Sequence, residues 1–126
     1  MASEGIKVSF KVWLEYGGEP LIGLGGARLL RLVDDTGSIS KAAEIMGVSY
    51  KFAWSYIKSV EKKLGVKIVE THRGGRGGGY AKLTEDGRKL ILFYEKLFKE
   101  FRDLALIFEE EGRGLLKNTI SSSEER

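Results

Sequence analysis

The segment "THRGGRGGGYAKLT", residues 71–84, holds five glycines and two arginines between two threonines. Arginine guanidinium groups bind phosphate oxygens, and glycine leaves the backbone amides free to donate to the same anion. Such segments occur in phosphate-binding loops of enzymes, in RNA-binding arginine–glycine repeats and at the tips of hairpins that lie along DNA. The surrounding residues decide among these three.

The two phosphate-binding loops fail on spacing. A Walker loop needs Gly-Lys-Ser or Gly-Lys-Thr between a strand and a helix, and neither tripeptide occurs in this sequence. The dinucleotide spacing G-x-G-x-x-G is also absent. RNA-binding arginine–glycine segments are usually long disordered repeats, whereas this one is short and lies in an expected hairpin. A hairpin tip that places Arg73 and Arg76 on DNA is favoured, and RNA binding comes second.

Other reactive side chains are few. His72 is the only histidine and the chain has no cysteine, so neither a metal site nor a disulfide is expected. The acidic residues are dispersed, or gather in "FEEEG" at 108–112, where solvation explains them better than acid–base chemistry. We find no catalytic constellation and expect a protein that is not an enzyme and uses no cofactor.

The positive charge is concentrated in the middle of the sequence. The net charge is +3, but residues 37–82 alone contain nine basic and three acidic side chains. The stretches on either side carry a small negative excess. This asymmetry indicates one face that meets a polyanion, although a solvated basic surface without a partner has the same composition.

Three short helices with start and stop signals are expected around this basic stretch. "GGARLLRLVDD" has helical spacing of its leucines and stops before Gly37. In "SISKAAEIMG", Ser38 or Ser40 can cap the start, and Gly47 ends the helix. "SYKFAWSYIKSVEKKLG" then begins with Ser49 as N-cap. Two helices joined by a short glycine-containing turn form a helix-turn-helix motif.

The third helix has two opposite faces at about 100° per residue. The buried face collects Ala53, Ile57, Val60 and Leu64. The outer face collects Lys51, Ser55, Lys58 and Lys62, and Trp54 flanks it. This outer face is cationic, and its small hydroxyl group allows close approach of another surface. A solvated lysine face is the plain alternative.

One hairpin is expected before the three helices and another after them. "IKVSFKVWLEY" alternates apolar and polar residues and predicts a half-buried strand over residues 8–16. Gly17-Gly18 suits a two-residue turn, and "EPLIG" would return as an edge strand. After the third helix, "KIVET" and "YAKLT" predict a second hairpin with the glycines at its tip.

One long helix is expected over residues 84–112, with Thr84 as its N-cap. About 28 residues at 1.5 Å each give roughly 40 Å, more than the width of a small domain. A heptad-like apolar stripe predicts a seam with a second copy of the chain, unless the stripe is core within one copy. Its members are Leu90, Tyr94, Leu97, Phe101, Leu104 and Phe108. A second line of Ile91, Phe98 and Ala105 faces the domain, and residues 113–126 read as a flexible tail.

The assembled pattern resembles a winged helix-turn-helix transcription factor of the α+β class, mainly α-helical. "GSISKAAEIMGVSYKFAW" and "GGRGGGYAKLTEDGRKLI" closely resemble the N-terminal DNA-binding domain of the ModE family of molybdenum-dependent regulators. "AAEIMGVSYKFAWSYIKSVEKKLG" is similar, more loosely, to the helix-turn-helix of LysR-type regulators. The likeness covers about residues 8–105 and implies a DNA-binding domain over 1–83 followed by a dimerisation helix over 84–112.

The resemblance also assigns roles to single residues. It implies that the start and outer face of the third helix contact DNA, and that wing residues contact the DNA backbone. The implied contacts are Ser49, Tyr50, Lys51, Trp54, Ser55, Lys58, Arg73, Arg76 and Lys82, and Lys62 joins them from the outer face. For Trp54, packing under the wing is an equal alternative.

ModE proteins commonly carry C-terminal molybdate-binding modules, and this sequence ends where they would begin. We expect no molybdate sensing by this chain, and a separate sensor protein could serve instead. The function expected is a cytoplasmic, nucleoid-associated, homodimeric transcription regulator that binds double-stranded DNA sequence-specifically and has no membrane span. A protein-interaction adaptor and a nonspecific DNA-coating protein are the alternatives.

Overall fold

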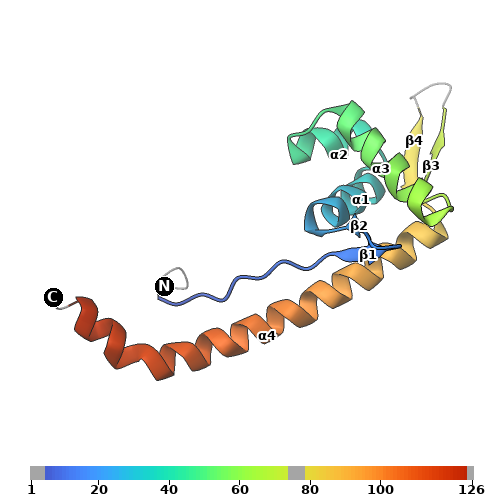
Figure 1. Cartoon of the computed structure of the whole chain (residues 1–126). Helices are drawn as coiled ribbons and strands as arrows, with labels where there is room; N and C mark the ends of the chain where they lie inside the picture. The colour runs from blue at the N-terminus through green and yellow to red at the C-terminus, as the bar shows by residue number, and fades with distance from the viewer. Residues whose placement is uncertain (1–4, 74–78, 125–126) are drawn as a thin grey trace.

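The computed structural model describes residues 5–73 and 79–124. Helices α1 to α3 pack together beside the hairpin β3–β4, and α4 extends from them as a long arm (Figure 1). This is the mainly helical winged-helix arrangement that the sequence predicts. The elements in chain order are β1 (Leu14–Tyr16), β2 (Glu19–Ile22), α1 (Leu24–Thr36), α2 (Ile39–Met46), α3 (Tyr50–Leu64), β3 (Val69–His72), β4 (Tyr80–Leu83) and α4 (Glu85–Glu124).

The ends of the three short helices lie where the sequence places them. Ser38 caps α2 by accepting a hydrogen bond from the Lys41 amide at 3.0 Å, so Ser38 and not Ser40 is the cap. Ser49 caps α3 by accepting from the Phe52 amide at 3.0 Å. A left-handed glycine follows each helix, because a Cβ atom is disfavoured in that conformation. These glycines are Gly37 (φ 71°), Gly47 (φ 73°) and Gly65 (φ 73°).

Small side chains let the helices of the core cross closely. Ala42 and Ala43 of α2 and Ala53 of α3 are fully buried, as are Leu30 and Val33 of α1. The buried side of α3 continues through Ile57 and Val60, and Leu64 packs on its edge. Since this side of α3 packs in the core, the opposite side faces solvent.

Hydrogen bonds hold the hairpin β3–β4, which forms the wing, against the end of α1. The Ala81 amide donates to the Gly37 carbonyl at 2.9 Å. The Leu83 amide donates to the Asp34 carboxylate at 3.0 Å. The base of the wing is therefore fixed to the helical core, and the predicted glycine-rich tip at residues 74–78 lies outside the described residues.

Glu61 fixes the wing to α3 as well. Its Oε2 accepts hydrogen bonds from the amides of Ile68 at 2.8 Å and Val69 at 3.2 Å, and its Oε1 lies 3.1 Å from Lys58 Nζ. Burial raises the pKa of this carboxyl, but the two amides and the Lys58 ammonium outweigh burial and hold the pKa of Glu61 below its ordinary value. This role could not be predicted from the sequence, where Glu61 is one of several charged residues on a helix.

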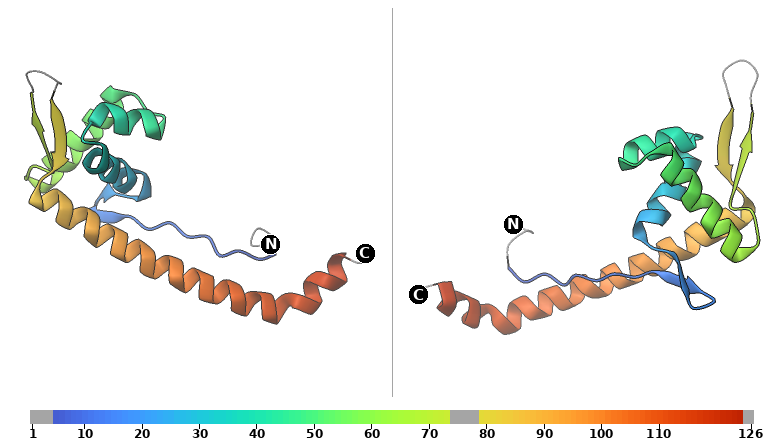
Figure 2. Two further views of the ribbon diagram at one scale, coloured as in Figure 1. Left: turned by 180° about the vertical axis from the view of Figure 1, so that it is seen from behind. Right: turned by 45° about the horizontal axis from the view of Figure 1, so that its top comes forward.

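The N-terminal segment corrects a prediction. Residues 8–16 do not form one strand: β1 covers only Leu14–Tyr16, and the chain before it runs alongside α4 (Figures 1 and 2). The Phe10 ring lies 5.3 Å from the Phe98 ring of α4. The alternation is therefore explained by side chains that face a helix at every second position, without a partner strand. The short hairpin β1–β2 with its Gly17-Gly18 turn is confirmed.

Two hydrogen bonds join this segment to α4. The Val8 amide donates to the Glu109 carboxylate at 2.8 Å, and the Tyr94 hydroxyl donates to the Val12 carbonyl at 2.7 Å. Tyr94 is 1% exposed. Tyr94 therefore does not form the predicted seam between two copies: its ring belongs to the hydrophobic core of its own chain.

Helix α4 is longer than expected. It begins after Thr84, whose hydroxyl accepts from the Gly87 amide at 3.0 Å, and it continues to Glu124 instead of ending at residue 112. Gly112 and Gly114 are poor helix formers, but Leu115, Leu116 and Lys117 favour helix and no proline interrupts them. Residues 113–124 of the expected flexible tail thus form further turns of α4. The helix changes direction in this last part, coloured red (Figure 1). No helix in the described residues is long and apolar enough to span a membrane.

Gly87 allows α4 to begin close to the wing. A Cβ atom at this position would overlap the Ile68 backbone carbonyl, whereas one at Gly25 of α1 would meet no atom nearby. Gly87→Ala should lower the free energy of unfolding by about 2 kcal/mol, since backbone must move to relieve the overlap. Gly25→Ala, the matched control, should be neutral or stabilise by up to about 1 kcal/mol. Urea denaturation measures both, and equal effects would contradict the close approach.

Because folding lowers the pKa of Glu61, its carboxylate stabilises the fold above the ordinary value of 4.5 and loses this effect as the pH falls through the folded value. Glu61→Gln should therefore lower the free energy of unfolding by about 1–2 kcal/mol at pH 7. The difference from the unmodified chain should shrink as the pH falls below 4.5. Glu44→Gln, an exposed position on α2, serves as control. A pH-independent difference would show that the charge of Glu61 is not what anchors the wing.

Candidate nucleic-acid interface

The outer face of α3 is fully available to a partner. The predicted contacts on it are all exposed: Ser49, Tyr50, Lys51, Trp54, Ser55, Lys58 and Lys62. They lie opposite the buried side formed by Ala53, Ile57 and Val60. The structure therefore brings these seven residues onto one surface, with three ammonium groups along the helix.

Trp54 lies on this surface and not in the core. Its side chain is 45% exposed, so it does not pack beneath the wing. The Lys58 ammonium lies 5.4 Å from the centre of the Trp54 ring, a cation–π distance. Because Lys58 also pairs with Glu61, the ammonium is held above the helix surface beside the indole.

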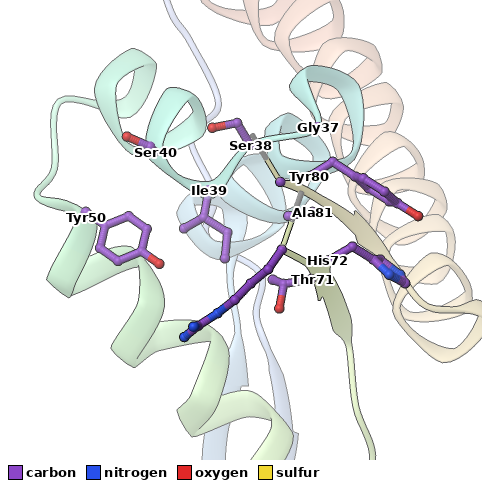
Figure 3. Close-up of a pocket in the computed structure, with 11 residues that line it drawn as sticks. Gly37, Ser38, Ile39, Ser40, Tyr50, Thr71, His72, Tyr80 and Ala81 are labelled. Carbon is purple, nitrogen blue, oxygen red and sulfur yellow. The ribbon is translucent and has the colours of Figure 1, made fainter. Parts of the chain in front are cut away.

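A hollow of about 450 Å³ lies between the helix-turn-helix and the wing. Figure 3 shows Ile39 and Ser40 of α2, Tyr50 of α3 and Thr71 of β3 around it. The hollow is lined by Gly37, Ser38, Ile39, Ser40, Tyr50, Thr71, His72, Arg73, Gly79, Tyr80 and Ala81. Hydroxyl groups from three different elements and the Arg73 guanidinium thus border one concave surface. These groups can donate hydrogen bonds to phosphate oxygens of a passing backbone.

The wing residues named from the sequence do not all belong to this hollow. Arg73 lines it, whereas Lys82 does not. The Lys82 ammonium instead pairs with Glu70 on the neighbouring strand at 3.6 Å and lies 5.9 Å from the Tyr80 ring. Arg76 lies outside the described residues.

Most residues of the hollow were not identified as contacts from the sequence, and three of them are polar side chains of α2 and β3. Ser40 was considered only as a helix cap, Thr71 only as part of a strand, and His72 only as a metal ligand, a role that was rejected. The His72 ring stacks on the Tyr80 ring with 4.6 Å between their centres, which gives the wing a flat aromatic pair. Their nearness to the arginine–glycine segment was the available signal, but it did not say which strand face meets α2.

The described residues contain no group of three or more side chains suited to hold a metal ion. Lys51, Lys62 and Arg73 make no ion pair among the described residues, and they lie exposed on α3 and at the wing together with the hydroxyl groups of both elements.

The family model for bacterial regulatory helix-turn-helix proteins of the lysR family matches residues 24–88. The transcriptional regulator ModE of Yersinia pestis is 44% identical over 69 residues, which are 55% of this chain and 26% of that protein. The molybdenum-pterin-binding protein MopB of Rhodobacter capsulatus is 39% identical over 82 residues, 65% of this chain and 30% of its own length. The chain therefore spans less than a third of these relatives.

Solved structures confirm the fold. The BenM_DBD/benA site 1 DNA complex superposes with a TM-score of 0.56 at 22% identity, over 71% of this chain and 94% of that one. ArgP from Mycobacterium tuberculosis superposes with a TM-score of 0.51 at 24% identity, over 67% of this chain and 30% of that one. The family match covers just over half of the 126 residues, from the start of α1 to the first turn of α4. This chain belongs to the lysR family of bacterial regulatory helix-turn-helix proteins.

Proposed function

We propose that this chain is a sequence-specific DNA-binding transcription regulator that acts as a homodimer in the cytoplasm. The observation that carries the proposal is the joint presentation of the α3 outer face and the wing hollow on one side of the core. A B-form major groove accommodates one α-helix, and a wing beside that helix reaches the adjacent backbone. The relatives named as transcriptional regulators, and the matched structure named as a DNA complex, support the same function.

The α3 residues divide into two proposed roles. Lys51, Lys58 and Lys62 are flexible cations suited to phosphates, which supply most of the affinity and its salt dependence. Tyr50 and Ser55 carry short or rigid hydroxyl groups suited to base edges, with Ser49 beside them at the helix start. Trp54, exposed beside Lys58, is a proposed contact to the sugar–phosphate surface.

The wing is proposed to hold the backbone next to the groove. Arg73, at the hollow, is its best-placed described cation, and Arg76 is proposed from the sequence alone. Lys82 is a weaker proposal, because its ion pair with Glu70 must open or be shared before the ammonium meets phosphate. Thr71 and Ser40 join the proposed contacts from opposite walls of the hollow.

Dimerisation is proposed through α4, with fewer seam residues than the sequence predicts. Tyr94 is core, and Leu90 packs against the core of its own chain. Phe101, Leu104 and Phe108 are exposed, and Leu97 is half-buried. Apolar side chains at this spacing on a projecting helix are stabilised when a second copy covers them. Two-fold symmetry then predicts an approximately palindromic site with half-sites about 34 Å apart, or a multiple of that distance.

The phosphate role of Lys58 is tested by salt-dependent fluorescence anisotropy. Lys58→Ala should weaken binding to selected and random duplexes alike and reduce the slope of log K against log salt by about 0.9. Ser55→Ala is the matched control on the same face: its slope should not change, and its effect should depend on the sequence bound. An unchanged slope for Lys58→Ala would remove this ammonium from the phosphate contacts.

The dimer seam is tested with two leucines of nearly equal exposure. Leu104 is 51% exposed and Leu106 is 55% exposed, but at about 100° per residue they lie on opposite sides of α4. Leu104→Glu should convert the dimer to monomer, because the carboxylate would be buried in an apolar seam. Leu106→Glu should leave the dimer intact. Sedimentation velocity distinguishes the species, and a monomeric unmodified chain or a dimeric Leu104→Glu variant would contradict this seam.

A further inference from the structure

A second cavity lies away from the α3 face and the wing. It has a volume of about 620 Å³ and lies between α1, α2 and α4. This size is within the range of small-molecule sites, about 300–1,000 Å³. We name it the α1–α4 cavity. Its apolar walls are Leu24, Ala27, Leu32, Ile45, Met46, Tyr94 and Phe98, and it shares no lining residue with the hollow beside the wing.

Four cations and one carboxylate complete the lining: Arg28, Arg31, Lys99, Arg102 and Glu95. Arg31 is bound to Glu95 by two hydrogen bonds, of 2.6 and 3.0 Å, and Lys99 pairs with Asp103 at 2.7 Å. Arg28 and Arg102 have no ion-pair partner among the described residues. The cavity therefore combines an apolar interior with two guanidinium groups whose charge is not neutralised.

The proposed dimer seam does not use this side of α4. Lys99 and Arg102 lie well over 100° around the helix from Leu104 at about 100° per residue. A second copy seated on Leu104 and Phe108 therefore leaves the α1–α4 cavity open. DNA on the α3 face leaves it open too, because no α3 residue lines it.

We propose that the α1–α4 cavity binds an organic carboxylate with an apolar body. The apolar body would lie on Leu32, Met46 and Phe98, and the carboxylate would accept hydrogen bonds from Arg28 and Arg102. A neutral apolar molecule leaves both guanidinium groups unpaired, and a small inorganic anion leaves the apolar walls empty. Such a ligand would bridge the helix-turn-helix to α4, so this inference adds a ligand site to the proposed function and does not depend on DNA binding.

The test uses the full chain without DNA and two compounds with the same ring system. Isothermal titration calorimetry should show one saturable site per chain for 2-naphthoate. The neutral 2-naphthalenemethanol should bind about tenfold more weakly or worse, because it cannot pair with the guanidinium groups. Equal affinities, or no saturable binding of 2-naphthoate, would overturn the proposal.

Variants then locate the site. Arg28→Gln combined with Arg102→Gln should weaken 2-naphthoate binding about tenfold. Lys96→Gln, an exposed cation of α4 outside the cavity, is the matched control and should change the affinity less than about twofold. Ile45→Ser should weaken both compounds, because it removes an apolar wall. All these side chains are exposed, so the variants should keep the fold, which circular dichroism checks. A control variant as weak as the double variant, or an Ile45→Ser variant that binds normally, would place the ligand elsewhere and overturn the proposal.

Discussion

Backbone hydrogen bonds hold the wing in a fixed position relative to α3. Glu61 sets it from one side by accepting two backbone amides at the start of β3. Asp34 and the Gly37 carbonyl set it from the other side by accepting the amides of β4. These half-buried bonds hold the base of the wing, at the start of β3 and along β4, against α1 and α3. A helix and a wing base held in this way present one preorganised surface, which lowers the ordering cost of binding for these residues.

Local signals allowed most of the fold to be predicted. Left-handed glycines after each short helix, and the Ser38 and Ser49 caps, act within one turn of the chain and are visible in the sequence. What could not be predicted depends on contacts between distant segments. The alternation of residues 8–16 is compatible with a strand or with packing on a helix, and only α4 decides it. The same contact supplies the hydrogen-bond partner of the Tyr94 hydroxyl, the Val12 carbonyl.

In the candidate site, too, local features could be predicted and contacts between distant segments could not. The outer face of α3 could be read from helical periodicity, because the core residues of one helix define its exposed side. The wing hollow could not, since Ser40 and Thr71 meet only after the hairpin folds back onto α2. The Lys82–Glu70 pair depends on the register of the hairpin, whereas the Lys58–Glu61 pair has an i,i+3 spacing that a helix makes visible in the sequence. They matter because a paired ammonium must give up or share a carboxylate before it neutralises a phosphate.

Sequence-specific DNA binding is tested by the ratio of the affinities for selected and unselected duplexes. Duplexes selected from a random pool and unselected duplexes would be compared by fluorescence anisotropy at one physiological salt concentration. We predict that the chain binds the selected duplex at least about 10³-fold more tightly. Equal affinity for both would indicate a nonspecific DNA-coating protein. Failure to bind any duplex at low salt would contradict DNA binding by this chain and favour a protein-interaction adaptor.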